Sequence, residues 1–187
     1  MHKIFFLLAF LLAFTDLTAQ SKTQIADRHI KSILQKTEDN RKGNLSLKSG
    51  LTRYDKKGNV IEIIEYNQDS SITRWEKFSF NKKGNETQYE ELDKDGKVIR
   101  KKISIYSSMG YLIEEQVFNS NNKMSEKTEI KYNNFNDKVK EIVLDGEGKI
   151  KTTANFDYDS KGMLRSKMIY NMEGKLIYSK TNTYHYK

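Results

Sequence analysis

Hydrophobic and polar positions along this chain repeat with a fixed spacing. From Tyr54 onward a large apolar residue recurs at steps of 12 and 14 residues, in strict alternation. Two steps make a unit of 26 residues, which is present about five times. Self-similarity at a fixed period of a few tens of residues is typical of a repeat protein. The recurring residues are Tyr54, Tyr66, Phe80, Leu92, Tyr106, Phe118, Tyr132, Leu144, Tyr158, Tyr170 and Tyr184.

A turn residue follows four positions after each of the first ten of these residues. Gly stands there seven times and Asn twice, and both tolerate a positive φ well. Flanking Asp, Asn, Lys and Ser favour a type I turn followed by a left-handed residue, a common hairpin connection. Ser70 is the one departure, so we expect an irregular turn around residues 69–71.

The segments between turns predict antiparallel strands. Because 12 and 14 are both even, we expect even-numbered positions to stay on one face of the sheet throughout. The recurring aromatic residues should then form two ladders on that face, one near each edge. Neither face carries a continuous row of apolar residues. Mixed faces of this kind are expected of a wide, thin sheet in which each strand packs mainly on its neighbours. We therefore predict an all-β fold, an antiparallel meander of repeated hairpins forming a wide curled sheet.

The first twenty residues have the pattern of a secretory signal peptide. Lys3 precedes an uninterrupted apolar run over residues 4–14, and the small residue Ala19 lies at a suitable cleavage point. The run is too short for a permanent membrane span. We expect residues 1–20 to be removed and the rest to work in the periplasm or outside the cell.

Residues 21–50 differ from the repeat. Apolar positions at Ile25, Ile30, Ile33 and Leu34 approximate one helical face, which predicts a short amphipathic helix over residues 22–38. A polar connector follows, with the repeat domain at residues 51–187.

Charge and composition narrow the function classes. Lys and Arg number 33 against 25 Asp and Glu, for a net charge of +8. The basic residues are spread along the chain, and export makes nucleic acid an unsuitable partner class. Cys is absent, which excludes disulfides, thiol nucleophiles and thiolate metal ligands.

Catalytic and metal-binding patterns are missing from the sequence. His29 and His185 do not combine with other residues into a nucleophilic or metal-binding set. Residues 93–96 and 145–148 resemble calcium loops only in part, because the full set of early ligands, a Gly after them and a late Glu is missing. Neighbouring carboxylates within an arm point to opposite faces of a strand. We therefore predict no catalytic, cofactor or metal site and a non-enzymatic protein.

Four aromatic residues lie outside the two ladders and break the repeat. Trp75, Tyr89, Tyr111 and Tyr178 could stack on sugar rings or anchor a protein partner. They are the predicted partner-binding residues.

The turn sequences resemble the YD repeat of the RHS family. The best matches are Tyr54-Asp55-Lys56-Lys57-Gly58-Asn59-Val60 and Tyr158-Asp159-Ser160-Lys161-Gly162-Met163-Leu164. Tyr170-Asn171-Met172-Glu173-Gly174-Lys175-Leu176 is close, and the resemblance covers residues 54–187. It implies an exported or cell-surface module with an extended β-sheet. The repeats are too few to enclose a shell, and toxin delivery does not carry over.

These observations favour an exported, non-enzymatic β-repeat protein that acts as a binding or structural module at the cell envelope or outside the cell. Its partner would be a protein or a cell-envelope glycan. The alternative is a periplasmic half-barrel carrier of lipid or another hydrophobic ligand. The mid-strand charges of Arg100, Lys102, Glu114 and Glu126 stand against that alternative. A calcium-stabilised adhesin fragment is a third hypothesis, and an exposed last strand would permit an edge-strand dimer.

Overall fold

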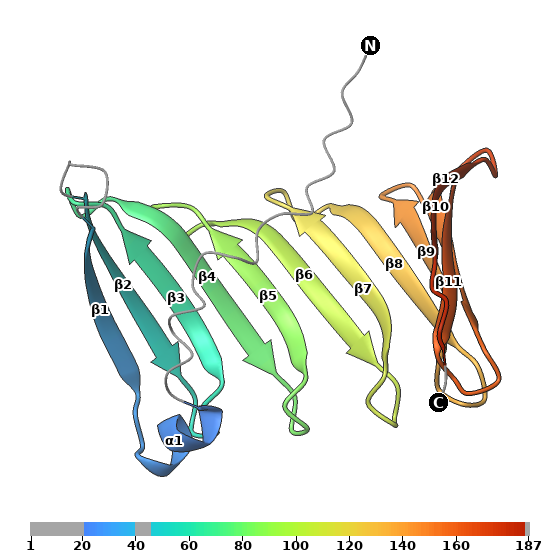
Figure 1. The fold of residues 1–187 in the computed structure, drawn as a ribbon. Coiled ribbons are helices and arrows are strands. Elements are labelled where there is room, and N and C mark those ends of the chain that lie inside the picture. Colours follow the sequence, from blue (N-terminus) through green and yellow to red (C-terminus); the bar gives the residue numbers. More distant parts are fainter. Residues whose placement is uncertain (1–20, 40–45, 186–187) are drawn as a thin grey trace.

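A computed structural model describes residues 21–39 and 46–185 (Figure 1). The predicted signal segment, residues 1–20, lies outside the described residues. Within them, twelve antiparallel strands form one sheet in chain order, with a single short helix before the first strand. The predicted all-β meander of hairpins is therefore confirmed.

The elements follow one another without a crossover. They are α1 (Lys22–Asp27), β1 (Ser32–Asp39), β2 (Ser46–Tyr54), β3 (Val60–Tyr66), β4 (Ile72–Phe80), β5 (Glu86–Leu92), β6 (Val98–Tyr106), β7 (Leu112–Asn119), β8 (Met124–Tyr132), β9 (Lys138–Asp145), β10 (Ile150–Tyr158), β11 (Leu164–Asn171) and β12 (Leu176–Thr181).

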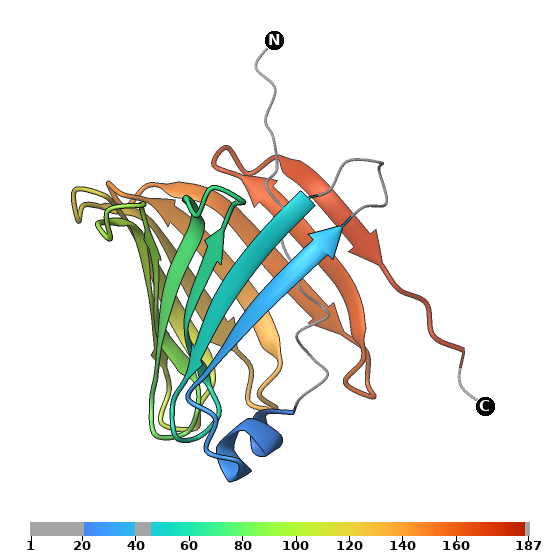
Figure 2. The same cartoon turned by 90° about the vertical axis from the view of Figure 1, so that its left-hand side faces the viewer.

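The sheet is open and uncurled. β1 pairs with β2 alone and β12 with β11 alone, so the sheet does not close. Figure 1 shows β2 to β7 face-on and β10 to β12 edge-on, and Figure 2 shows the same sheet from the β1 end. The expected curl is replaced by the progressive rotation of neighbouring strands that every β-sheet shows.

The helix is shorter than the sequence pattern predicts. A capping box of Ser21 and Gln24 begins α1, which ends at Asp27. Residues 32–38, predicted to continue the helix, belong instead to β1. All eight residues of β1 pair with β2, which satisfies far more backbone hydrogen bonds than the end of a short helix would.

The hairpin turns share one geometry. At the β2–β3 turn, the Asp55 N–H donates to the Asn59 carbonyl at 2.9 Å, and the Gly58 N–H donates to the Asp55 carbonyl at 3.1 Å. Gly58 has a φ of +76°, as the predicted type I turn with a left-handed residue requires. The turn at Ser70 is equally regular, with a φ of +65° and the same two hydrogen bonds. The expectation of an irregular turn there was wrong.

The first residue of most turns caps the turn with its side chain. Asp55 Oδ1 accepts the backbone N–H groups of Lys57 at 2.8 Å and Asn59 at 2.9 Å. This bonding explains why an acid or amide follows the recurring aromatic residue. The Lys149 N–H, bonded in the same way, holds the pKa of the Asp145 carboxyl below its ordinary value. The same pair of hydrogen bonds is made by Asn81, Asp93, Asn119, Asn133, Asp145, Asp159 and Asn171.

One extra residue beside each of these turns changes which face of the sheet the odd-numbered and even-numbered side chains occupy. Tyr54 pairs with Val60, but the next pair is Arg53 with Glu62, so Ile61 is a bulge residue. Similar register shifts accompany the other hairpins from β2 to β12. Odd positions of β2 therefore share a face with even positions of β3.

The two aromatic ladders consequently lie on opposite faces, and the expectation that even positions keep one face was wrong. We call face I the face with Thr52, Glu76 and Tyr89, and face II the face with Glu62 and Trp75. By the pairing register, the ladder that begins at Tyr54 lies on face I. The ladder that begins at Tyr66 lies on face II.

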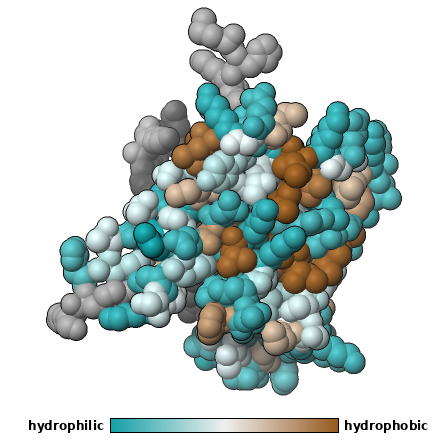
Figure 3. Space-filling model, turned by 90° about the vertical axis from the view of Figure 1, so that its right-hand side faces the viewer, coloured by the Kyte–Doolittle hydropathy of each residue, from teal (hydrophilic) through white to brown (hydrophobic). Residues whose placement is uncertain are grey.

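Few apolar side chains are buried, because no second layer covers the sheet. Among the described residues the buried hydrophobic side chains are Ile25, Ile64, Leu92 and Ala154. Figure 3, which views the β12 end, shows hydrophobic residues in separate patches among polar ones. Leu176, Ile177 and Tyr178 of β12 are about half exposed. The edge-strand dimer stays a prediction.

Tyrosine hydroxyls tie adjacent hairpins together along the face I ladder. Tyr132 Oη donates to the Leu112 carbonyl at 2.9 Å, and Tyr158 Oη donates to the Lys138 carbonyl at 2.9 Å. Tyr106 and Tyr184 make the equivalent bonds at 2.8 and 3.0 Å. Each bond reaches back twenty residues. The hydroxyl thus gives a structural reason why Tyr fills five of the six positions of this ladder, whereas Leu or Phe fills three of the five positions of the other.

Removing one of these hydroxyls should destabilise the sheet measurably. We expect Tyr132→Phe to lower the free energy of unfolding by about 1 kcal/mol, because one part-buried hydrogen bond is lost. Tyr178→Phe, at an exposed position, should change it by less than about 0.5 kcal/mol. Urea unfolding followed by circular dichroism measures both, and equal effects would contradict the role of the hydroxyl.

Candidate functional site

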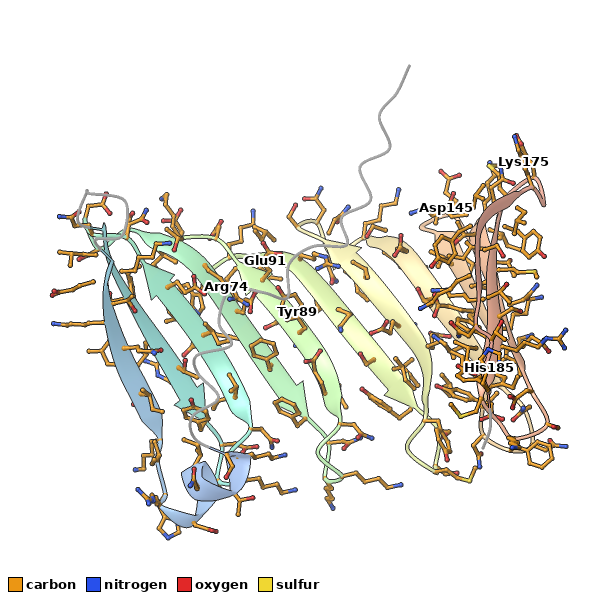
Figure 4. The ribbon with its side chains drawn as sticks, in the orientation of Figure 1. Arg74, Tyr89, Glu91, Asp145, Lys175 and His185 are labelled. Atoms are coloured by element: carbon orange, nitrogen blue, oxygen red, sulfur yellow. The ribbon has the colours of Figure 1, made fainter. Side chains whose placement is uncertain are left out.

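A polar cleft lies on face I, near the edge that carries the β3–β4 and β5–β6 turns. Its volume is about 620 Å³. Strands β1 and β2 contribute Gln35, Thr37, Lys48, Ser49 and Gly50 to one side. The lining from β3 to β6 includes Glu65, Arg74, Glu76, Tyr89, Glu91 and Arg100. Figure 4 shows Arg74, Tyr89 and Glu91 close together on this part of the sheet.

Arg74 holds two carboxylates in the cleft. Its Nη1 lies 2.8 Å from Glu65 Oε1, and its Nη2 lies 2.7 Å from Glu76 Oε2. Glu76 is buried, with 8% of its surface exposed. The hydrogen bond to Glu76 is the main reason why the pKa of the Arg74 guanidinium is raised. These two ion pairs hold Arg74, Glu65 and Glu76 together within the cleft lining.

Tyr89 is fixed by the same network. Its Oη donates to Glu76 Oε1 at 3.0 Å, and its ring packs on Phe78 with 5.5 Å between centroids. Burial raises the pKa of the Tyr89 hydroxyl, and the negative charge of Glu76 raises it further. Tyr89 therefore stays a neutral hydrogen-bond donor with its ring held in place.

The raised pKa of Tyr89 predicts alkaline sensitivity. The pKa of Tyr89 is higher in the folded protein than in the unfolded chain, where it has the ordinary Tyr value of about 10. The neutral hydroxyl therefore stabilises the folded protein fully below about pH 10, and this stabilisation is lost as the pH rises through the folded-state pKa. We expect the melting temperature to fall above about pH 10, and to fall less steeply in Tyr89→Phe. Thermal melts from neutral to strongly alkaline pH measure this. Parallel curves for the two proteins would contradict it.

Glu91 and Arg100 are opposite charges on neighbouring strands, and both line the cleft. They pair in register across β5 and β6. Arg100 is exposed, and within the described part of the chain it makes no ion pair at salt-bridge distance. These two side chains offer a cation and an anion to a ligand in the cleft.

The structure separates the four aromatic residues that the sequence analysis singled out. Tyr89 lies in the cleft, whereas Trp75 lies on face II. The Trp75 Nε1 donates to Glu62 Oε1 at 2.8 Å, and the Lys77 ammonium lies 5.3 Å from the Trp75 ring centroid. The Trp75 ring also covers Gly96, where a Cβ would approach it to 3.2 Å. Trp75 is therefore engaged in packing between strands.

Tyr111 and Tyr178 lie elsewhere. Tyr111 is the last residue of the β6–β7 turn, and its ring packs on Tyr132 at 5.3 Å between ring centroids. Tyr178 lies on the terminal strand β12. The four residues do not form one surface, and their role in partner binding stays a prediction.

Sequence reasoning missed Arg74, Glu76 and Glu91 as members of a site. Arg74 and Glu76 have even numbers and Glu91 has an odd number, so Glu91 shares their face only because the β4–β5 hairpin contains a bulge residue. Once the bulges are known, pairs of opposite charge on neighbouring strands are the sequence feature that would indicate this cluster.

Metal ligands and membrane-spanning helices are the two remaining features that concern function. No group of three or more His, Cys, Asp or Glu residues among them is arranged to hold a metal ion. In the same part of the chain, no helix has both the length and the apolar character needed to cross a membrane.

Comparisons with known proteins assign no family. No family model matches the chain, and no curated protein matches its sequence. A porin-like protein from Bacteroides uniformis is similar in structure, with a TM-score of 0.38 and 12% identity over 82% of this chain and 56% of that chain. TarM gives a TM-score of 0.27 and 15% identity over 85% of this chain and 22% of that chain. The chain thus spans little more than half of the first protein and less than a quarter of the second, and likenesses this weak carry no functional argument.

Proposed function

We propose that this chain is an exported, non-enzymatic β-repeat protein that binds a glycan of the cell envelope in the cleft of face I. The observation that carries the proposal is the cleft lining, in which Arg100, without an ion pair among the described residues, lines the same cleft as the fixed network of Arg74, Glu76 and Tyr89. The signal-like residues 1–20 support export to the periplasm or the exterior.

The cleft chemistry fits a hydroxyl-rich ligand. Sugars present hydrogen-bond donors and acceptors at high density, and Glu91 and Arg100 supply both kinds of partner. The ring of Tyr89 is held by Phe78 and Glu76, so little side-chain freedom is lost on binding. The volume of about 620 Å³ is within the range of small-ligand sites.

The same chemistry disfavours a hydrophobic cargo. A lipid carrier needs an apolar interior, whereas Arg74, Glu76 and Glu91 line this cleft. Among the described strands the sheet is also open, since β1 and β12 each have a neighbour on one side only. The half-barrel carrier therefore remains the less favoured alternative.

The relation to YD repeats is part of the proposal. The capping of the turn by Asp55, directly after Tyr54, supports it because this bonding gives the Tyr-Asp pair a structural reason. We propose that the chain is a short, exported relative of the RHS family whose repeats supply a binding surface and no catalytic group.

Titration with oligosaccharides released from the host's own envelope polysaccharide tests the glycan proposal. We expect residues 21–187 to bind them and Arg100→Ala to weaken binding about tenfold, because a hydrogen bond from a charged group is lost. Arg165→Ala, an exposed arginine of β11 outside the cleft, is the matched control and should bind like the parent. Absence of binding by the parent protein, or equal binding by both variants, would overturn the proposal.

A further inference from the structure

The residues at the tips of the hairpin turns differ in kind between the two edges of the sheet. We call the third residue of each turn its tip, and the edge near α1 the lower edge, as drawn in Figure 1. The lower-edge tips are Lys57, Lys83, Met109, Phe135 and Lys161. The opposite, upper edge has Asp69, Asp95, Asn121, Glu147 and Glu173 at the same position. All ten tips are exposed.

Two neighbouring lower-edge tips break the pattern of basic residues. Phe135 is 85% exposed and Met109 is 68% exposed. The tips of the two preceding lower-edge turns are lysines whose side chains extend along the edge to the next turn. The Lys57 Nζ donates to the Lys82 carbonyl at 2.9 Å, and the Lys83 Nζ donates to the Ser108 carbonyl. Met109 and Phe135 instead project apolar side chains, two strands or about 10 Å apart.

Charge distinguishes the two edges further. The five lower-edge turns, residues 55–59, 81–85, 107–111, 133–137 and 159–163, hold five lysines and three aspartates. The five upper-edge turns, residues 67–71, 93–97, 119–123, 145–149 and 171–175, hold five lysines and six acidic residues. The lower edge is therefore the one that suits an anionic surface.

We propose that the lower edge docks on an anionic lipid bilayer. Met109 and Phe135 enter the boundary between headgroups and acyl chains, while the lysine tips on either side contact lipid phosphates. Apolar side chains flanked by lysines are the combination that holds proteins at such interfaces. The cleft lies towards the upper edge, so docking leaves it open to ligand.

A bilayer fits this edge better than a protein partner. A stable protein interface needs about 800 Å² of complementary surface on each side, with a packed centre. The lower edge instead offers two separate apolar side chains on projecting turns. A fluid interface accommodates such points without matching their shape.

A single-site label tests insertion directly, because the chain contains no Cys. Phe135→Cys, labelled with a polarity-sensitive fluorophore on residues 21–187, should shift to shorter emission wavelength on phosphatidylcholine vesicles that contain phosphatidylglycerol. Pure phosphatidylcholine vesicles should give a smaller shift. Met172→Cys is the matched control, since Met172 is 70% exposed on an upper-edge turn, and its label should not respond.

Vesicle sedimentation with unlabelled protein supplies the second readout. The double variant Met109→Ser, Phe135→Ser should bind the anionic vesicles about tenfold more weakly, while Met172→Ser should bind like the parent. Added salt should weaken the binding of all three proteins. No binding by the parent, or no loss in the double variant, would overturn the proposal. If the parent protein does not bind vesicles but forms a dimer that dissociates in the double variant, then Met109 and Phe135 contact a second copy of the chain. That result would also overturn the proposal. Neither readout depends on glycan binding.

Discussion

Gly58→Ala is expected to destabilise the protein far more than Gly162→Ala, although the two glycines occupy the same turn position. Both have a φ of +76°. A Cβ at Gly162 would meet no atom within 4 Å, so alanine there costs only the left-handed backbone conformation, about 1–2 kcal/mol. A Cβ at Gly58 would lie 2.2 Å from the Lys22 carbonyl oxygen.

The additional cost at Gly58 comes from the backbone of α1. Lys22 is the first residue of the helix, so the clash must be relieved by moving the helix or the turn. Forced overpacking adds about 1–3 kcal/mol to the cost of the left-handed conformation. Movement of α1 would also uncover Ile25, which is 3% exposed.

Urea unfolding of the two glycine variants separates the contributions. We expect a larger loss for Gly58→Ala, together with faster proteolysis within α1 in that variant alone. Equal losses in the two variants would show that the contact between α1 and the β2–β3 turn contributes nothing to stability.

Arg74→Met is expected to lower the free energy of unfolding by about 2–3 kcal/mol, because it leaves two part-buried carboxylates without their shared cation. The Glu76 side chain is only 11% exposed, so water replaces the lost partner poorly. Met retains most of the length and the apolar stem of the side chain, so packing changes little.

Arg165→Met is the matched control for Arg74→Met. The Arg165 Nε lies 3.8 Å from Asp157 Oδ2, and both side chains are more than half exposed. Exposed ion pairs contribute about 0–1 kcal/mol, so the control should lose little. Adding Glu65→Gln to Arg74→Met should restore part of the stability, since one uncompensated charge is removed. Equal losses for the two arginine variants would contradict the ion network.

The period, turn type and strand order could be predicted from the sequence because each follows from local chemistry. A residue tolerant of positive φ at a constant offset sets each turn, as Gly58 and Asn122 show. Turns joined by short arms leave little choice but a meander of neighbouring hairpins. The all-β class therefore follows without any knowledge of packing.

The faces of the sheet could not be predicted in the same way. Counting residues gives even steps, but the bulge residue Ile61 and its equivalents shift the parity at each hairpin. The ion network of Arg74, Glu76 and Tyr89 assembles only after that shift. β1 was missed for a different reason, since Ile25, Ile33 and Leu34 happen to share a helical spacing. Pairing with β2, a tertiary contact, outweighs that pattern.

Native mass spectrometry of the protein, purified gently from its own host's envelope fraction, shows whether the chain carries a glycan. We expect bound masses that differ by sugar units, and we expect them to be absent from Arg100→Ala prepared in the same way. A retained mass of lipid size would contradict this expectation and favour the carrier, and a bare chain in both preparations would contradict the glycan site.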